Sequence, residues 1–234
     1  MFDSLLAGVR RRDHAFTVYR GDEPTDVESL FAAHGVEVDV RSLPPDGPDP
    51  FVLIETDGEF VGVIGAAELD GLLEPPIVRP GERDEVSAGY RAVFELFDDT
   101  LFSSMRRGAL LAVSHEIEDR AYRVGTGALH ASFQRFSAFR PQVDAYRHLA
   151  ADTDLDVHVY GDDDWDPPAI PGVGYHAVDD DELRRHWVLA FDGGDGGQPC
   201  GLVAVEESDE YTGFWTDDDA LVEDIIAAVT AAAA

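Results

Sequence analysis

The sequence contains no lysine, and all 17 of its basic residues are arginine. Against them stand 48 aspartates and glutamates, so the formal net charge of the 234 residues is −31. Self-repulsion at this charge density destabilises a compact state unless counter-ions screen it. We therefore interpret the composition as an adaptation to a salt-rich (halophilic) host, with an ordinary acidic protein as the alternative.

The scarcity of basic residues excludes whole classes of function. Binding to nucleic acid requires clustered cations, and the one cluster, Arg10 to Arg12, suits the end of a first helix, where positive charge complements the helix dipole. A standard phosphate-binding P-loop requires a lysine. We expect no direct nucleic-acid partner and no P-loop.

Cysteine and long apolar runs are also scarce. Cys200 is the only cysteine, which excludes an intramolecular disulfide and a multi-cysteine zinc site. Residues 1–15 lack the apolar core of a signal peptide, and residues 225–234 are too short to span a bilayer. The sequence therefore predicts a cytoplasmic protein without membrane contact, and it contains no motif for a metal or for any particular cofactor.

What is present is a chain that can bury a core, since 44% of its residues are hydrophobic. Hydrophobic periodicity and turn signals predict two successive series of elements. In the first series we expect helices at 3–12, 26–35 and 66–76, strands at 14–21 and 36–43, and a hairpin at 50–64 that turns at Asp57-Gly58. A helix at 86–105 connects it to the second series, with helices at 109–125, 138–150 and 218–229, strands at 128–134 and 154–161, and a hairpin at 186–207.

The similar order of the two series indicates an internal duplication. We predict an α/β fold with mixed parallel and antiparallel sheets flanked by helices, built from two related α-β-α-β-β-β-α-like halves. Residues 1–80 and 107–234 should superpose. The corresponding domains would be an N-terminal α/β half with its connecting helix at 1–105 and a C-terminal domain at 106–234.

Two short motifs suggest chemistry that the residues do not support. The segment HEIED at 115–119 has an aspartate where a zinc-protease helix requires its second histidine, so a solvated acidic helix is predicted instead. The segment GGDGG at 193–197 resembles the signature of diguanylate cyclases but lacks the acidic residues that follow the glycines there. We interpret it as a flexible hairpin loop.

Strand alternation collects polar side chains on one face of each of two neighbouring strands. A covering helix with satisfied hydrogen bonds, or a simply wet face, would explain these sets as well as a site would. The residues concerned are His130, Ser132 and Gln134 on the first strand and Asp156, His158 and Tyr160 on the second.

A candidate ligand site follows if these two strands are parallel neighbours. Their carboxyl ends then meet where the long Pro-rich loop 161–174 leaves the sheet, which is where open α/β sheets bind ligands. Gln134 would supply an amide and Tyr160 a phenol, and Glu118 would orient neighbouring arginines. Trp215 would offer a stacking face, although core packing explains Phe214 and Trp215 equally well.

Several segments together resemble the DICT sensory domain, especially its stand-alone form in halophilic archaea. The resemblance is strongest from about 105 to 222, and the first hundred residues are similar to the amino-terminal part of those archaeal proteins. The segments are SHEIEDRA, GALHASFQRFSAF, VDAYRHLAADTDLDVHVYG, WVLAFDGG, CGLVAVEE and GFWTDD.

This resemblance implies a sensory or signal-input module, since the family occurs beside diguanylate cyclases and in two-component systems and is linked to light response. It supplies no catalytic or ligand-binding residues to carry over. No kinase, receiver, cyclase or helix-turn-helix segment is recognised here, so we expect output through an unidentified signalling protein or self-association. A small-molecule enzyme that uses the polar strand faces of the C-terminal half is the alternative.

Overall fold

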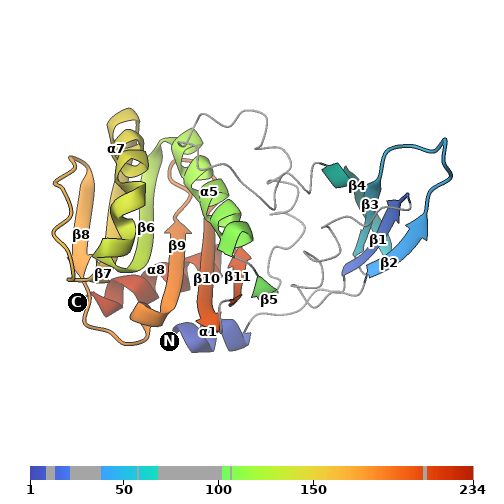
Figure 1. The fold of residues 1–234 in the computed structure, drawn as a ribbon. Coiled ribbons are helices and arrows are strands. Elements are labelled where there is room, and N and C mark those ends of the chain that lie inside the picture. The colour runs from blue at the N-terminus through green and yellow to red at the C-terminus, as the bar shows by residue number, and fades with distance from the viewer. Residues whose placement is uncertain are drawn as a thin grey trace.

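The structure, a computed structural model, describes residues 1–8, 14–21, 38–56, 58–67, 102–105, 107–207 and 210–233. Its strands form two sheets, and helices flank both faces of the larger one (Figure 1). The predicted α/β class with mixed sheets is confirmed. The helix predicted at 26–35 lies outside the described residues, as do the largest parts of those predicted at 66–76 and 86–105.

The smaller sheet has the strand order β2-β1-β3-β4. Strands β1 and β2 are parallel, whereas β1 with β3 and β3 with β4 are antiparallel. The predicted hairpin joins β3 to β4, and Gly58 in its turn has a φ of 80°, a left-handed conformation that glycine adopts without strain. The strands are β1 (His14–Arg20), β2 (Val38–Ser42), β3 (Phe51–Thr56) and β4 (Glu59–Gly65).

The larger sheet has the strand order β5-β11-β10-β9-β6-β7-β8. Strands β6, β7 and β8 are parallel to one another, and the remaining neighbours are antiparallel. The strands are β5 (Phe102–Met105), β6 (Thr126–Arg135), β7 (Asp154–Asp162), β8 (Val173–Ala177), β9 (His186–Phe191), β10 (Cys200–Glu207) and β11 (Glu210–Thr216).

The two sheets share the arrangement of four strands. The order β2-β1-β3-β4 recurs as β7-β6-β9-β10, with the same parallel and antiparallel relationships. The last residue of β1 pairs with the last residue of β2, and Arg135 at the end of β6 likewise pairs with Asp162 at the end of β7. Two related halves would share such a strand order, so it agrees with the predicted duplication. The domain boundary at 105/106 stays a prediction.

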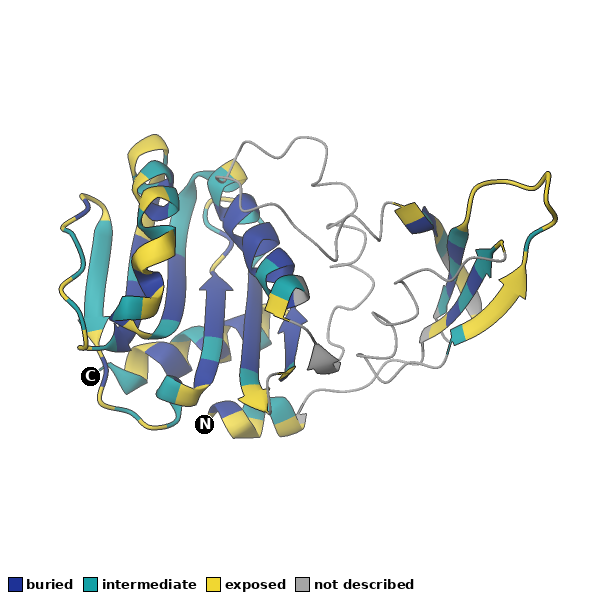
Figure 2. Cartoon of the chain, viewed as in Figure 1, coloured by how far each residue is buried: buried dark blue, intermediate teal, exposed yellow. Residues whose placement is uncertain are grey.

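Helices cover the larger sheet on both faces (Figure 1). On one face, apolar side chains of the sheet pack against α5 and α7; on the other face they pack against α1 and α8. Figure 2 shows the central strands of this sheet as almost continuously buried. The helical elements are α1 (Phe2–Gly8), α5 (Arg107–Val124), α6 (Phe136–Phe139), the 3₁₀ turn η1 (Arg140–Gln142), α7 (Val143–Asp152), the 3₁₀ turn η2 (Leu183–Arg185) and α8 (Asp219–Ala232).

The acidic segment of α5 is buried, so the prediction of a solvated acidic helix was wrong. Glu116 is only 2% exposed. Its Oε1 accepts hydrogen bonds from Arg120 Nε at 3.4 Å and Arg123 Nη2 at 3.0 Å, and Arg120 Nη1 donates to Asp217 Oδ2 at 3.1 Å. Guanidinium partners of this kind make the burial of carboxylates tolerable. The partnership with Asp217 spans 97 residues and is invisible to helical periodicity.

Three strands of the larger sheet differ from the sequence prediction. Residues 102–105, expected at the end of a helix, form strand β5 beside β11. Phe214 and Trp215 belong to strand β11, which was not predicted. Helix α8 follows them, close to the predicted helix at 218–229, and the Asp218 side chain caps it by accepting a hydrogen bond from the backbone N–H of Leu221. Strand β8 was not predicted at all.

The GGDGG loop does connect β9 to β10, but it is closely packed against the start of β6. Asp192 Oδ1 accepts hydrogen bonds from the backbone N–H groups of Ala128 and Gly194, both at 2.9 Å. A Cβ atom on Gly194 would lie 2.1 Å from the carbonyl oxygen of Thr126. The predicted hairpin connection is therefore confirmed, and glycine is required at position 194 for close backbone approach.

Within the part of the chain that the structure describes, every helix is too short or too polar to cross a membrane.

Candidate functional site

A groove of ≈ 580 Å³ opens at the carboxyl ends of β6 and β7. It arises because β9 is shorter than the strands on either side of it. The first residue of β9, His186, pairs with Val205 of β10, and the last pairing between β9 and β6 joins Val188 to Ser132. Strands β6 and β10 both continue beyond these pairs, where β9 no longer lies between them. The turn η2, which directly precedes β9, lies at this end of the sheet. The lining residues are Gln134, Arg135, Asp162, Arg184, Arg185, Val205, Glu206 and Glu207.

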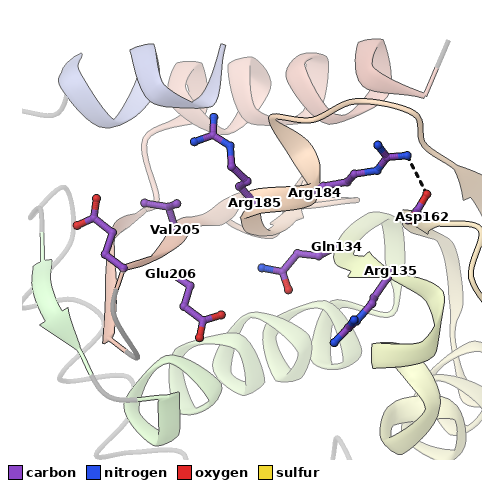
Figure 3. A pocket seen from close by; sticks show the side chains of 8 residues that line it. Gln134, Arg135, Asp162, Arg184, Arg185, Val205 and Glu206 are labelled. Carbon is purple, nitrogen blue, oxygen red and sulfur yellow. Dashed lines mark hydrogen bonds and ion pairs between the residues drawn. The ribbon is translucent and has the colours of Figure 1, made fainter.

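Gln134 is the one non-glycine residue with a positive φ in the described part of the chain, at 60°. It lies at an irregularity in the β6–β7 register between Ser132 and Arg135, and its backbone N–H donates to Ser132 Oγ at 3.4 Å. Left-handed backbone is unfavourable for residues with a Cβ and is concentrated at functional sites. Its amide points into the groove (Figure 3).

The three arginines of the groove differ in their partners. Arg184 Nη2 lies 2.8 Å from Asp162 Oδ1 and 2.9 Å from Asp179 Oδ1, and its guanidinium points away from the groove centre (Figure 3). Arg185 pairs with Asp3 of helix α1 at 3.6 Å. Arg135 is exposed and forms no ion pair with any residue that the structure describes. It is the cation that the groove leaves available.

Four aromatic and imidazole rings stack across β6, β7 and β8 on the face toward α8. His130 and His158 have ring centroids 4.7 Å apart, and so do Tyr160 and His176. His130 Nδ1 lies 2.9 Å from Tyr160 Oη. His158 Nε2 lies 3.2 Å from Asp156 Oδ2, and His158 Nδ1 lies 3.0 Å from His176 Nε2. The stack therefore contains two short hydrogen-bonded chains.

Burial favours the neutral form of two of the imidazoles in this stack, those of His130 and His176. It lowers the pKa of His130 from 6.5 to about 4, and the neighbouring imidazoles act in the same direction. Burial also lowers the pKa of His176. If the only ring proton of His158 is on Nε2 and is donated to Asp156, then Nδ1 accepts from His176 Nε2, and the carboxylate sets the tautomer of both rings. In the described residues, no group of histidine, cysteine and acidic side chains has the arrangement of a metal site.

Glu118 lies on the opposite face of the sheet from this stack. Tyr146 Oη of helix α7 donates to Glu118 Oε1 at 3.0 Å, and both residues are buried. They line a cavity of ≈ 20 Å³ between α5, α7 and the sheet, about the space that one water molecule needs. Glu116 contacts both Arg120 and Arg123, and the orienting role that we expect for Glu118 stays a prediction.

A buried charged cluster and the single cysteine lie near each other at the end of α5. Burial raises the pKa of Glu116, although the guanidinium groups of Arg123 and Arg120 act in the opposite sense. Burial also raises the pKa of Cys200 to about 12. A thiol of this kind is protonated at neutral pH and is therefore a poor nucleophile or metal ligand.

The predicted site residues thus fall into four places. Gln134 lies in the groove, whereas Tyr160 belongs to the buried ring stack with His130 and His158. The two strands are parallel and end together, as expected, but their side chains do not share a cavity. Glu118 lines the small internal cavity, and the fourth place is that of Trp215, which is fully buried in the core.

Sequence reasoning missed three residues of these sites. His176 was missed because strand β8 was not predicted within the Pro- and Gly-rich stretch. Arg135 directly follows the predicted strand at 128–134, and Glu206 is the second-last residue of the predicted hairpin at 186–207, so a rule that includes charged residues at and beside strand ends would have found them. No local signal shows that β9 is shorter than its neighbours, which is what opens the groove.

Comparisons with known proteins give one informative match. Residues 97–208 match the model of the family DICT, described as "Sensory domain in DIguanylate Cyclases and Two-component system". A search of curated proteins gives no match. A polyphosphate kinase from Porphyromonas gingivalis is similar in structure at 13% identity, with a TM-score of 0.36. That alignment covers 98% of this chain and 48% of the kinase chain, so this chain spans about half its length.

The likeness to the kinase carries no argument, because its TM-score is too low to establish a common fold. The family match is different, because it covers the elements that build both the groove and the ring stack, from β5 to β10. Residues 97–208 of this chain are therefore similar to the sensory domains of the DICT family.

Proposed function

We propose that this protein is a sensory input module that binds a small ligand in the groove at the carboxyl ends of β6 and β7. The bound state is read by a separate signalling protein or through self-association. The family supports a sensory role. The signal is a light-dependent or other environmental stimulus, and the module acts in the cytoplasm of a salt-adapted host.

The observation that carries this proposal is the left-handed Gln134 at the edge of the groove. A residue that would be more stable in an extended conformation is held there by the surrounding sheet. Such strain is retained where a side chain must be presented in a particular direction. The groove also lies at the end of the parallel strands, where open α/β sheets bind their ligands.

A copurification experiment tests the ligand. Wild type, Arg135→Ala and Arg147→Ala are purified at high KCl, and bound molecules are identified by native mass spectrometry and an absorbance spectrum. Arg147, on helix α7, is an exposed arginine outside the groove and serves as the matched control. The proposal predicts a bound molecule in wild type and the control that Arg135→Ala loses. A molecule that all three proteins retain would place the ligand elsewhere.

The salt-adapted host is tested by stability. The net charge of −31 predicts that the thermal midpoint falls as KCl is lowered from molar concentration to about 0.1 M, because the screening length grows from about 3 Å to 10 Å. An unchanged midpoint across the KCl series would remove the argument for a halophilic host.

An enzyme is the second candidate, and the chain of hydrogen bonds from Asp156 through His158 to His176 favours it. A carboxylate that fixes an imidazole tautomer is a common arrangement in acid–base catalysis. A broad substrate screen tests it. Turnover that is lost in His130→Gln and His158→Gln, but kept in Cys200→Ala, would establish catalysis; absence of turnover in wild type would count against it.

A further inference from the structure

Opposite charges lie on opposite walls of the groove. Arg135 ends strand β6 on one wall, and Glu206, near the end of β10, lies on the other. Figure 3 shows the two charged groups on either side of the open space with the amide of Gln134 between them. Both charged residues are exposed, and the structure records no ion pair between them among the residues it describes.

The other charged residues of the groove are already engaged or reinforce this polarity. Arg184 is held by Asp162, and Arg185 pairs with Asp3. Glu207 adds a second carboxylate to the lining on the β10 side. Among the described residues, Arg135 is therefore the groove cation without an ion-pair partner; it lies beside Asp162, which Arg184 holds, and the β10 wall carries the carboxylates of Glu206 and Glu207.

This polarity discriminates between ligands of different charge. A simple anion would gain from Arg135 but would be repelled by Glu206, and a simple cation would meet the reverse. A ligand that carries both charges gains from both walls. A guanidinium also binds a carboxylate through two parallel hydrogen bonds, which favours a carboxylate as the anionic group.

We propose that the ligand of this groove is a small zwitterion of the amino-acid type. Its carboxylate binds Arg135, its ammonium group binds Glu206, and Gln134 donates to or accepts from polar groups between the two ends. Binding of this kind bridges β6 and β10 across the short end of β9. This inference rests on the proposed function, because it assigns a chemical class to the ligand of the same groove.

A series of probes tests the assignment by isothermal titration calorimetry at a KCl concentration where the protein is folded. The zwitterions are glycine, β-alanine, 4-aminobutyrate, 5-aminovalerate and 6-aminohexanoate, whose charges lie progressively further apart. Butyrate and butylammonium carry one charge each. We expect one chain length to bind about tenfold or more tightly than either single-charge probe, because two charge-assisted contacts form instead of one.

Variants show whether the two walls are responsible. Arg135→Gln and Glu206→Gln should each weaken binding of the best zwitterion about tenfold, and Arg147→Gln should leave it unchanged. Arg135→Glu and Glu206→Arg should each abolish binding, and the double variant should restore it with the ligand reversed. Circular dichroism confirms that each variant is folded.

Three outcomes would overturn the assignment: butyrate binding as tightly as the best zwitterion, Arg135→Gln leaving its affinity unchanged, or binding of none of the probes. Each is distinguishable from failure of the proposed function. A copurified molecule of another class that depends on Arg135 would keep the groove as the sensory site and refute only the zwitterion.

Discussion

Replacing Gln134 by glycine should stabilise the protein. A left-handed backbone costs a residue with a Cβ atom roughly 1–2 kcal/mol, whereas glycine adopts a φ of 60° freely. Glycine also makes the unfolded chain more flexible, which lowers the free energy of unfolding by about 0.5–1 kcal/mol. The backbone hydrogen bond to Ser132 Oγ is kept. We therefore expect a net gain of about 0.5–1 kcal/mol in the free energy of unfolding.

Two further substitutions isolate the backbone effect. Gln134→Val puts a β-branched side chain into the same conformation and should destabilise the protein by at least about 1 kcal/mol. Arg135→Gly is the neighbouring control: Arg135 has an extended φ of −148°, so glycine there should cost about 0.5–1 kcal/mol. Glycine should therefore raise the free energy of unfolding at position 134 and lower it at position 135.

Urea denaturation at constant KCl measures these differences, and thermal melts should shift by roughly 2–4 °C per kcal/mol. A Gln134→Gly variant that is less stable than wild type by about as much as Arg135→Gly would refute the reasoning. Gln134 would then be in an unstrained environment, and the observation that supports the groove as a functional site would be lost.

Three other perturbations follow from the structure. Tyr146→Phe removes a buried hydrogen bond to Glu118 and should cost about 1.5–3 kcal/mol in urea denaturation. Gly194→Ala creates a backbone clash and should destabilise far more than Gly196→Ala, where a Cβ meets no atom within 4 Å and only the φ of 83° costs about 1–2 kcal/mol. His130 has a pKa near 6.5 in the unfolded chain but about 4 in the folded protein, so only the unfolded chain takes up a proton between these values. The free energy of unfolding therefore falls by up to about 3 kcal/mol as the pH drops from 6.5 to 4. His130→Gln should flatten this pH dependence.

Each of these three predictions on Tyr146, Gly194 and His130 would be contradicted by a specific result. Tyr175→Phe removes a partly buried hydrogen bond to the Pro168 carbonyl and should cost only about 1 kcal/mol, so equal losses at Tyr146 and Tyr175 would deny a special role to the buried carboxylate. Equal losses for the two alanine variants would mean that the loop is not closely packed. An unchanged pH dependence in His130→Gln would place the acid-sensitive group elsewhere.

Local sequence rules predicted the elements whose determinants are local. The parallel pair β6 and β7 followed from a strand-helix-strand order, and the hairpin of β3 and β4 from a tight turn at Gly58. Alternation correctly separated His130 from Leu129 and Ala131, because neighbouring strand residues always point to opposite faces.

The remaining features depend on contacts between distant residues. The burial of Glu116 requires Arg120, whose second partner is Asp217 far along the chain. Strand β5 has only four residues and exists by pairing with β11, so no periodicity could reveal it. The groove depends on the relative lengths of three strands, which a one-dimensional pattern does not encode.

A crystal structure of the protein purified with its bound molecule at high KCl would show directly where the ligand lies. We predict density between β6 and β10, in contact with the side chains of Gln134 and Arg135 and facing Glu206. Density beside His130 and Tyr160 on the α8 face, with an empty groove, would contradict it.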